Sequence, residues 1–94
     1  MKIKSIIWRP EVIEKIESVH GVTVDEVEEI FRPGTIYRRG PRGKRQRENV
    51  YKAYGQTDAR RYLFVVFIYK LDRRALILSA RDMNENERDL YRKG

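Results

Sequence analysis

Apolar residues recur at three- and four-residue steps in two stretches of the first third of the chain, a spacing typical of α-helices. The first stretch covers residues 10–20, begins with a proline suited to a first helical turn, and is stopped by Gly21. The second starts at Thr23, which can form a capping box with Glu26, and ends before the Pro-Gly pair at 33–34. The pattern predicts two short helices, which we expect to pack against each other as a hairpin.

After the second helix the pattern changes to runs of β-branched and aromatic residues, which favour strands. Four such runs are joined by connections too short for helical crossovers: residues 35–38, 50–54, 62–69 and 75–78. Short connections join antiparallel neighbours, so we predict an antiparallel meander with the long 62–69 run at its centre. A short strand is also predicted within residues 2–8.

The C-terminal residues predict a third helix, because Asn84 can cap it with Glu87 three residues further on. The predicted fold class is therefore α+β. Two N-terminal helices pack on a twisted antiparallel sheet, and a C-terminal helix follows the last strand.

The size of the chain fits one compact domain over residues 1–94, with 40% hydrophobic residues to form its core. The sequence contains no cysteine, which excludes disulfides and thiolate metal sites and is compatible with a reducing cytoplasm. No apolar run approaches the roughly 20 residues that cross a bilayer. We therefore expect a soluble, cytoplasmic protein without a membrane partner.

The net charge of +7 is concentrated in the middle of the chain. Residues 38–61 carry nine Lys and Arg against two Asp and Glu, whereas residues 1–37 carry five against seven. Such a cluster suits a polyanion, because each neutralised phosphate releases counterions and strengthens binding. A solvated loop or an acidic protein partner is the alternative. The residues that we predict to bind nucleic acid are Arg38, Arg39, Arg42, Lys44 and Arg45.

The side chains available for phosphodiester chemistry are mostly arginines and tyrosines. The single histidine, His20, excludes a paired-imidazole mechanism, and we expect it to interact with the carbonyls that end the first helix. The carboxylates are spread along helix faces, so no metal site and no cofactor is predicted. RNA carries its own nucleophile, the 2′-hydroxyl, and arginines can neutralise the charge that develops on the phosphate. Arg47, Arg61 and Arg81 would suffice if brought to one sheet surface, although each can equally be a solvent-facing or ion-paired strand residue.

Several short motifs resemble those of the BrnT toxins, small ribonucleases of toxin-antitoxin systems. In the N-terminal half these are Trp8-Arg9-Pro10, His20-Gly21 and Thr23-Val24-Asp25-Glu26. In the middle they are Arg47-Glu48, Gly55 and Arg60-Arg61-Tyr62-Leu63, and at the end Ser79-Ala80-Arg81, Glu87-Arg88 and Tyr91. The chain departs from the family pattern at Arg9, where Asp is usual, and at Val19, where a basic residue is common.

The resemblance implies a fold similar to the RelE and ParE toxins, cleavage of RNA, and neutralisation by a BrnA-type antitoxin that also binds operator DNA. The toxin-antitoxin complex can contain a toxin homodimer. By motif, the family's functional arginines correspond to Arg47, Arg61 and Arg81. We expect Arg81 and Arg61 to hold the scissile phosphate and Arg47 to assist. Tyr62 or Tyr91 could act as the base, although an unperturbed tyrosine titrates near 10.

We therefore interpret the chain as a metal-independent endoribonuclease toxin that cleaves RNA and so inhibits translation and growth. Two alternatives stay open. A noncatalytic RNA- or DNA-binding module would explain aromatic strands beside basic residues. A ParE-like toxin acting on a target other than RNA would share the fold.

Overall fold

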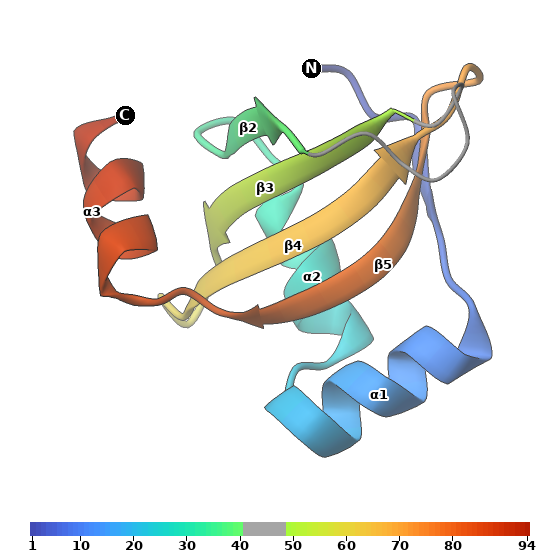
Figure 1. The fold of residues 1–94 in the computed structure, drawn as a ribbon, viewed down its shortest axis with the longest axis horizontal. Helices are drawn as coiled ribbons and strands as arrows, with labels where there is room; N and C mark the ends of the chain where they lie inside the picture. Colours follow the sequence, from blue (N-terminus) through green and yellow to red (C-terminus); the bar gives the residue numbers. More distant parts are fainter. Residues whose placement is uncertain (41–48) are drawn as a thin grey trace.

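The computed structural model describes residues 1–40 and 49–94, and these form a five-stranded sheet with three helices (Figure 1). In chain order the elements are β1 (Ser5–Ile7), α1 (Pro10–His20), α2 (Val24–Ile30), β2 (Ile36–Arg39), β3 (Val50–Gln56), β4 (Tyr62–Tyr69), β5 (Arg74–Asp82) and α3 (Glu85–Lys93). The predicted α+β class is confirmed. The capping boxes predicted for the second and third helices are both present.

The sheet has the strand order β1-β5-β4-β3-β2, so β4 is the central strand, as predicted. Strands β2 to β5 form the predicted antiparallel meander. The prediction of a wholly antiparallel sheet was wrong for β1, which pairs with β5 in parallel. These two strands are joined through most of the chain, so no tight turn fixes their relative direction.

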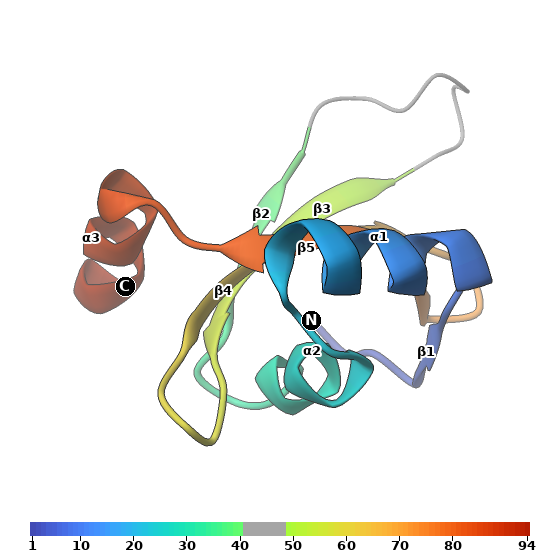
Figure 2. The ribbon, with the colours of Figure 1, turned by 90° about the horizontal axis from the view of Figure 1, so that it is seen from below.

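Helices α1 and α2 each pack on the sheet and do not pack against each other as a hairpin, which corrects the prediction. Helix α1 lies against β5, and α2 lies against β3 and β4 (Figures 1 and 2). Each apolar stripe therefore faces the strands, and the linker residue Val22, which is completely buried, lies in the same core cluster as residues of both helices.

The core lies between these two helices and one face of the sheet, which we call the inner face. Helix residues such as Ile16 and Ile30 meet alternating strand residues such as Leu63 and Val65, all of them at most 1% exposed. Helix α2 approaches β3 most closely at Gly55, where an added Cβ atom would lie 2.8 Å from Cβ of Ile30. A side chain at this position would push the helix off the sheet.

A β-bulge in β5 changes which residues face the core. Val66 pairs with Ser79 and Phe67 with Ile77, so Leu78 is an extra residue without a partner on β4. Before the bulge, Ile77 faces the core, and after it Ala80 does. The residues on either side of Ala80, including Arg81, therefore point to the opposite face, which we call the outer face.

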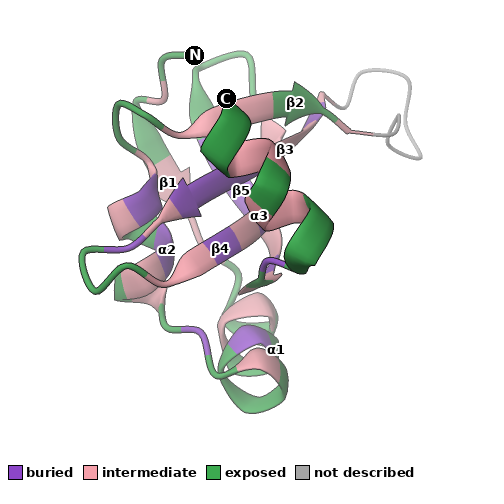
Figure 3. Cartoon of the chain, turned by 90° about the vertical axis from the view of Figure 1, so that its left-hand side faces the viewer, coloured by how far each residue is buried: buried purple, intermediate pink, exposed green. Residues whose placement is uncertain are grey.

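The outer face carries two rows of side chains that cross the sheet in register. The first row consists of Ile36, Tyr54, Phe64 and Arg81, and the second of Arg38, Lys52, Val66 and Ser79. Helix α3 lies beside one end of this face, where the rings of Tyr62 and Tyr91 meet edge to face at 5.9 Å. Figure 3 shows that α3 contains half-buried and exposed residues only. The helix is thus held mainly by contacts of partly exposed side chains.

Candidate functional site

Arg81 lies near the end of β5 on the outer face, where β1 no longer pairs with β5 and β5 is the edge of the sheet. Strand β5 continues to Asp82, four residues beyond the predicted end. The guanidinium of Arg81 stacks over the ring of Phe64, with its carbon 4.3 Å from the ring centroid. This contact with the neighbouring strand fixes the plane of the guanidinium at the β5 end of the first row.

The partner of Arg81 is Glu87, from the first turn of α3. Nη1 donates to Oε1 at 2.8 Å and Nη2 to Oε2 at 2.9 Å, and Nη1 also donates to the carbonyl of Asp82 at 3.0 Å. This bidentate bond to Arg81 is the main reason that the pKa of Glu87 lies below its usual range, and the same bond raises the pKa of Arg81. The pair is ionised at neutral pH and ties α3 to the sheet.

Arg81 still has unused donors. A guanidinium carries five N–H groups, and three of those of Arg81 bind acceptors within residues 1–40 and 49–94. The remaining two are the Nε hydrogen and one Nη2 hydrogen, which form one side of the planar fork. With its side chain 35% exposed, Arg81 can offer this pair to two oxygens of one phosphate.

Two polar side chains next to this pair were missed by the sequence interpretation. Lys52 adds a smaller electrostatic lowering of the pKa of Glu87, and the phenol of Tyr54 adds a smaller raising of the pKa of Arg81. Both belong to β3, two residues apart, so strand alternation puts them on one face. That alternation is the signal that could have found them, once the outer face is known to be the one opposite α1 and α2.

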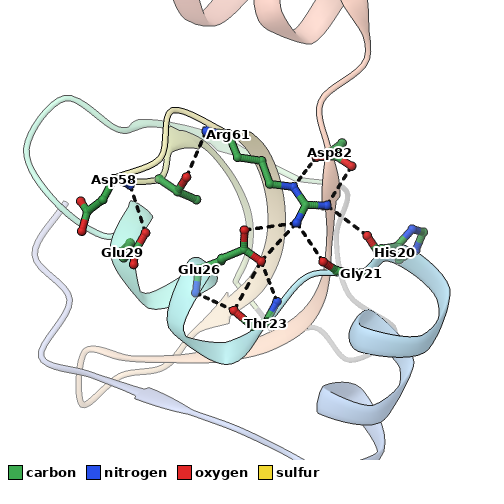
Figure 4. Close-up of polar contacts among 9 residues, drawn as sticks. His20, Gly21, Thr23, Glu26, Glu29, Asp58, Arg61 and Asp82 are labelled. Atoms are coloured by element: carbon green, nitrogen blue, oxygen red, sulfur yellow. Dashed lines mark hydrogen bonds and ion pairs between the residues drawn. The ribbon is translucent and has the colours of Figure 1, made fainter.

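Arg61 lies on the inner side of the sheet, so the prediction that Arg61 and Arg81 share one surface was wrong. Arg61 precedes β4 and reaches between the end of α1 and the start of α2 (Figure 4). It binds Asp82 through Nε at 2.6 Å and Nη2 at 3.0 Å. Arg61 and Asp82 point to the helices, whereas Arg81, which precedes Asp82 in β5, points away from them.

The remaining donors of Arg61 are also occupied. Nη1 donates to the carbonyl of Gly21 at 2.8 Å and to both carboxylate oxygens of Glu26 at 3.1 and 3.2 Å. Nη2 donates to the carbonyl of His20 at 3.1 Å. The five N–H groups therefore all have protein acceptors, and the hydrogen bonds to Asp82 are the largest cause that raises the pKa of Arg61.

Arg61 thus performs the role that the sequence suggested for the side chain of His20. Its guanidinium neutralises the carbonyls at the C-terminal end of α1, while Gly21 adopts the left-handed conformation at φ 61° that ends the helix. It also lowers the pKa of Asp82 through their hydrogen bonds. The proposal that Arg61 binds the scissile phosphate is not supported by these contacts.

The other predicted site residues are distributed around the outer face and β2. Tyr62 and Tyr91 meet at the end of the sheet beside α3, where Arg92 lies over the Tyr62 ring at 5.6 Å. Arg38 belongs to the second row of the outer face, whereas Arg39 binds the hydroxyl of Tyr51 at 3.2 Å on the inner side. The predicted residues Arg42, Lys44, Arg45 and Arg47 lie outside the described residues.

Within the described ranges, no three His, Asp or Glu side chains are close enough together to hold a metal ion. In the same part of the chain, no helix has the length and apolar character needed to cross a membrane.

Comparison with known proteins identifies the family. The family model described as "Ribonuclease toxin, BrnT, of type II toxin-antitoxin system" matches residues 8–87. The chain belongs to the BrnT family. Its fold is also similar to the crystal structure of the ribonuclease toxin BrnT from Brucella abortus, with a TM-score of 0.62 and 16% identity over 89% of this chain and 100% of that chain. No curated protein sequence gives a significant match.

Membership in the BrnT family makes the chain a ribonuclease toxin of a type II toxin-antitoxin system, which implies an RNA target and an antitoxin partner. The BrnT-like motifs fall into two groups in the structure. Trp8 donates from its indole to Glu28 at 3.1 Å, and the His20-Gly21 motif receives Arg61, so these motifs support the inner side. The Ser79-Ala80-Arg81 motif and Glu87 instead meet at the outer face.

Proposed function

We propose that this BrnT family member is a metal-independent endoribonuclease whose RNA-binding and cleavage site is the outer face of the sheet. By cleaving RNA it would inhibit translation and growth, and a BrnA-like antitoxin would neutralise it in the cytoplasm. A toxin homodimer within that complex fits the same scheme.

The unused fork of Arg81 is the observation that carries this proposal. Its Nε and Nη2 hydrogens have no acceptor among the described residues, and Phe64 holds the guanidinium plane in place. A phosphate bound side-on would complete both hydrogen bonds, which gives an arginine its advantage over a lysine at such sites. As the phosphorane forms, its additional negative charge would strengthen this contact.

Basic residues flank Arg81 on one side and aromatic residues on the other. Lys52 and Arg38 are neighbours in the second row and would neutralise adjoining phosphates. Residues of the segment between β2 and β3 would extend the grip on RNA, with Arg47 assisting at the scissile phosphate as the sequence suggests. Tyr62 and Tyr91 remain candidates for proton transfer at the end of the sheet nearest α3.

The experiment that tests this proposal is incubation of purified protein with end-labelled RNA in the presence of EDTA. We expect cleavage to continue, because the 2′-hydroxyl supplies the nucleophile and arginine supplies the positive charge. The products should end in a 2′,3′-cyclic phosphate or its hydrolysed form. A strict requirement for added magnesium or zinc would overturn the metal-independent mechanism.

One observation also favours a noncatalytic nucleic-acid-binding module. The half-buried rings of Tyr62 and Tyr91 lie 5.9 Å apart with Arg92 over the Tyr62 ring, an aromatic and basic combination that can bind unpaired bases. The same RNA incubation separates the two functions. Binding without cleavage under all metal conditions would favour the module.

A further inference from the structure

The first turn of α3 places a carboxylate against the unused fork of Arg81. Glu87 is the third residue of the helix, where its backbone N–H donates to Asn84 and its side chain accepts from the Asn84 backbone at 2.8 Å. This capping box fixes the rotamer of Glu87 before any substrate arrives. Its position relative to Arg81 is therefore set by the fold.

One acceptor position of Glu87 is unused. An ionised carboxylate has about four lone-pair positions. Oε1 accepts from Arg81 and from the Asn84 backbone, whereas Oε2 accepts from Arg81 alone among the described residues. The Glu87 side chain is 16% exposed, so it is not sealed from solvent.

Oε2 and the unused fork share one atom. Nη2 of Arg81 donates one hydrogen to Oε2 at 2.9 Å, and its other hydrogen belongs to the unused fork. A phosphate held by that fork would therefore lie next to Oε2. The 2′-hydroxyl that attacks this phosphate is only a few bonds away from it in RNA, so Oε2 is the carboxylate oxygen placed to receive its proton.

We infer that Glu87 is the general base of the cleavage reaction, taking the proton of the attacking 2′-hydroxyl while Arg81 holds the phosphate. This inference deepens the proposed function and depends on it. It replaces Tyr62 and Tyr91 in the role of the base, and leaves them as contacts for the RNA.

The reaction balances without a metal or other cofactor. The 2′-oxygen bonds to phosphorus as its proton passes to Oε2, the bond from phosphorus to the 5′-oxygen breaks, and the leaving 5′-oxygen takes a proton from water. The hydroxide so formed removes the proton from Glu87, which restores the carboxylate. The products are a 2′,3′-cyclic phosphate and a 5′-hydroxyl. The bond to Arg81 keeps the pKa of Glu87 low, so the base is ready over the whole neutral range.

The test compares Glu87→Gln with Glu26→Gln. Both residues are capping-box glutamates that bind an arginine, but Glu26 lies on the inner side against Arg61. Glutamine keeps the capping geometry in each case and cannot accept a proton at neutral pH. We expect Glu87→Gln to lower the single-turnover cleavage rate about a hundredfold. The control should cleave at the wild-type rate once its folded fraction is taken into account.

The RNA affinity of Glu87→Gln provides a second readout. If Glu87 only held the site together, its replacement would lower this affinity. Removing a negative charge beside Arg81 should leave the affinity for uncleavable 2′-O-methyl RNA unchanged or increase it. Lost cleavage with undiminished binding supports the inference. Lost cleavage with equally lost binding overturns it, because it would show that Glu87 only holds the site together.

The pH dependence of the wild-type protein gives a test that needs no variant. With Glu87 as the base, the cleavage rate should be nearly flat from about pH 5.5 to 8.5, because a carboxylate is ionised throughout. A tyrosine base would instead give a rise of about tenfold per pH unit over this range. A rise of that size would overturn the inference but not the proposed function. So would a Glu87→Gln variant that cleaves RNA at the wild-type rate. Absence of cleavage by the wild-type protein overturns the proposed function as well.

Discussion

The inner and outer faces of the sheet carry the same pair of residue types in two different states. On each face an arginine binds the capping-box glutamate of a helix, Arg61 with Glu26 of α2 and Arg81 with Glu87 of α3. All five N–H groups of Arg61 have protein acceptors, whereas two of those of Arg81 have none within the described residues. Unused donors, rather than charge or residue type, separate the proposed phosphate-binding arginine from the supporting one.

The two arginines also hold different amounts of structure. Arg61 joins the end of α1, the start of α2 and the end of β5. Arg81 joins β5 to α3, a helix without a buried residue, and stacks on Phe64 of the neighbouring strand. Loss of Arg61 should therefore affect folding, and loss of Arg81 should affect chemistry.

The largest expected effect is that of Arg61→Ala on stability. The variant leaves Glu26, Asp82 and two helix-terminal carbonyls without their donor, so the free energy of unfolding should fall by about 3 kcal/mol. Urea unfolding followed by circular dichroism measures this change. Arg74→Ala removes an exposed pair with Asp72 and should cost less than about 1 kcal/mol. Stability near that of the wild type together with lost cleavage would show that Arg61 acts on the RNA after all.

The next largest effect concerns Arg81→Lys. Lysine keeps the charge but loses the planar fork, so single-turnover cleavage should fall tenfold or more, equivalent to about 1.4 kcal/mol of transition-state stabilisation. RNA affinity and melting temperature should change much less. Arg74→Lys is the matched control. The lysine variant could instead cleave at the wild-type rate while Arg81→Ala mainly lowers the melting temperature. That result would show that the Arg81–Glu87 pair, like the Arg61–Glu26 pair, serves only to stabilise the fold.

The smallest effect is the pH dependence of stability. The pKa values of Glu26, Asp82 and Glu87 are all lowered in the folded protein. Their contribution is therefore complete above the carboxylate pKa of the unfolded chain, about 4, and is lost as pH falls further. Melting temperatures between pH 7 and 3 should fall less steeply in Arg61→Ala, which already lacks the two inner pairs. An equally steep fall in the melting temperature of Arg61→Ala would show that groups other than Glu26 and Asp82 cause the acid sensitivity.

The sequence predicted the features whose causes are local. Both capping boxes and the end of α1 at Gly21 depend on residues a few positions apart, and the strands of the meander are joined by short connections. The parallel pairing of β1 with β5 depends on contacts about 70 positions apart along the chain, as from Ser5 to Arg74, and no local pattern encodes it.

The site was predicted only as far as residue type allows. Arg81 was selected by its motif, but the motif does not reveal which face it occupies or which donors are free. Arg61 looked equivalent because an arginine beside a strand can serve either face. Lys52 was overlooked because its importance depends on register with Arg38 and on its position near Glu87, and both arise only when the sheet is assembled.

The β-bulge at the unpaired residue Leu78 determines which face of the sheet Arg81 occupies. If Leu78 instead took a regular place in β5, the alternation that buries Ala75 and Ile77 would continue and bury Arg81 as well. The bulge therefore keeps the Ser-Ala-Arg motif in the register that turns Arg81 outward. Deletion of Leu78 would leave Arg81 on its present face, because Ile77, Ser79, Ala80 and Arg81 would then alternate regularly. Straightening the bulge with every residue kept would instead turn the arginine into the core, and could silence the toxin with every proposed site residue still present.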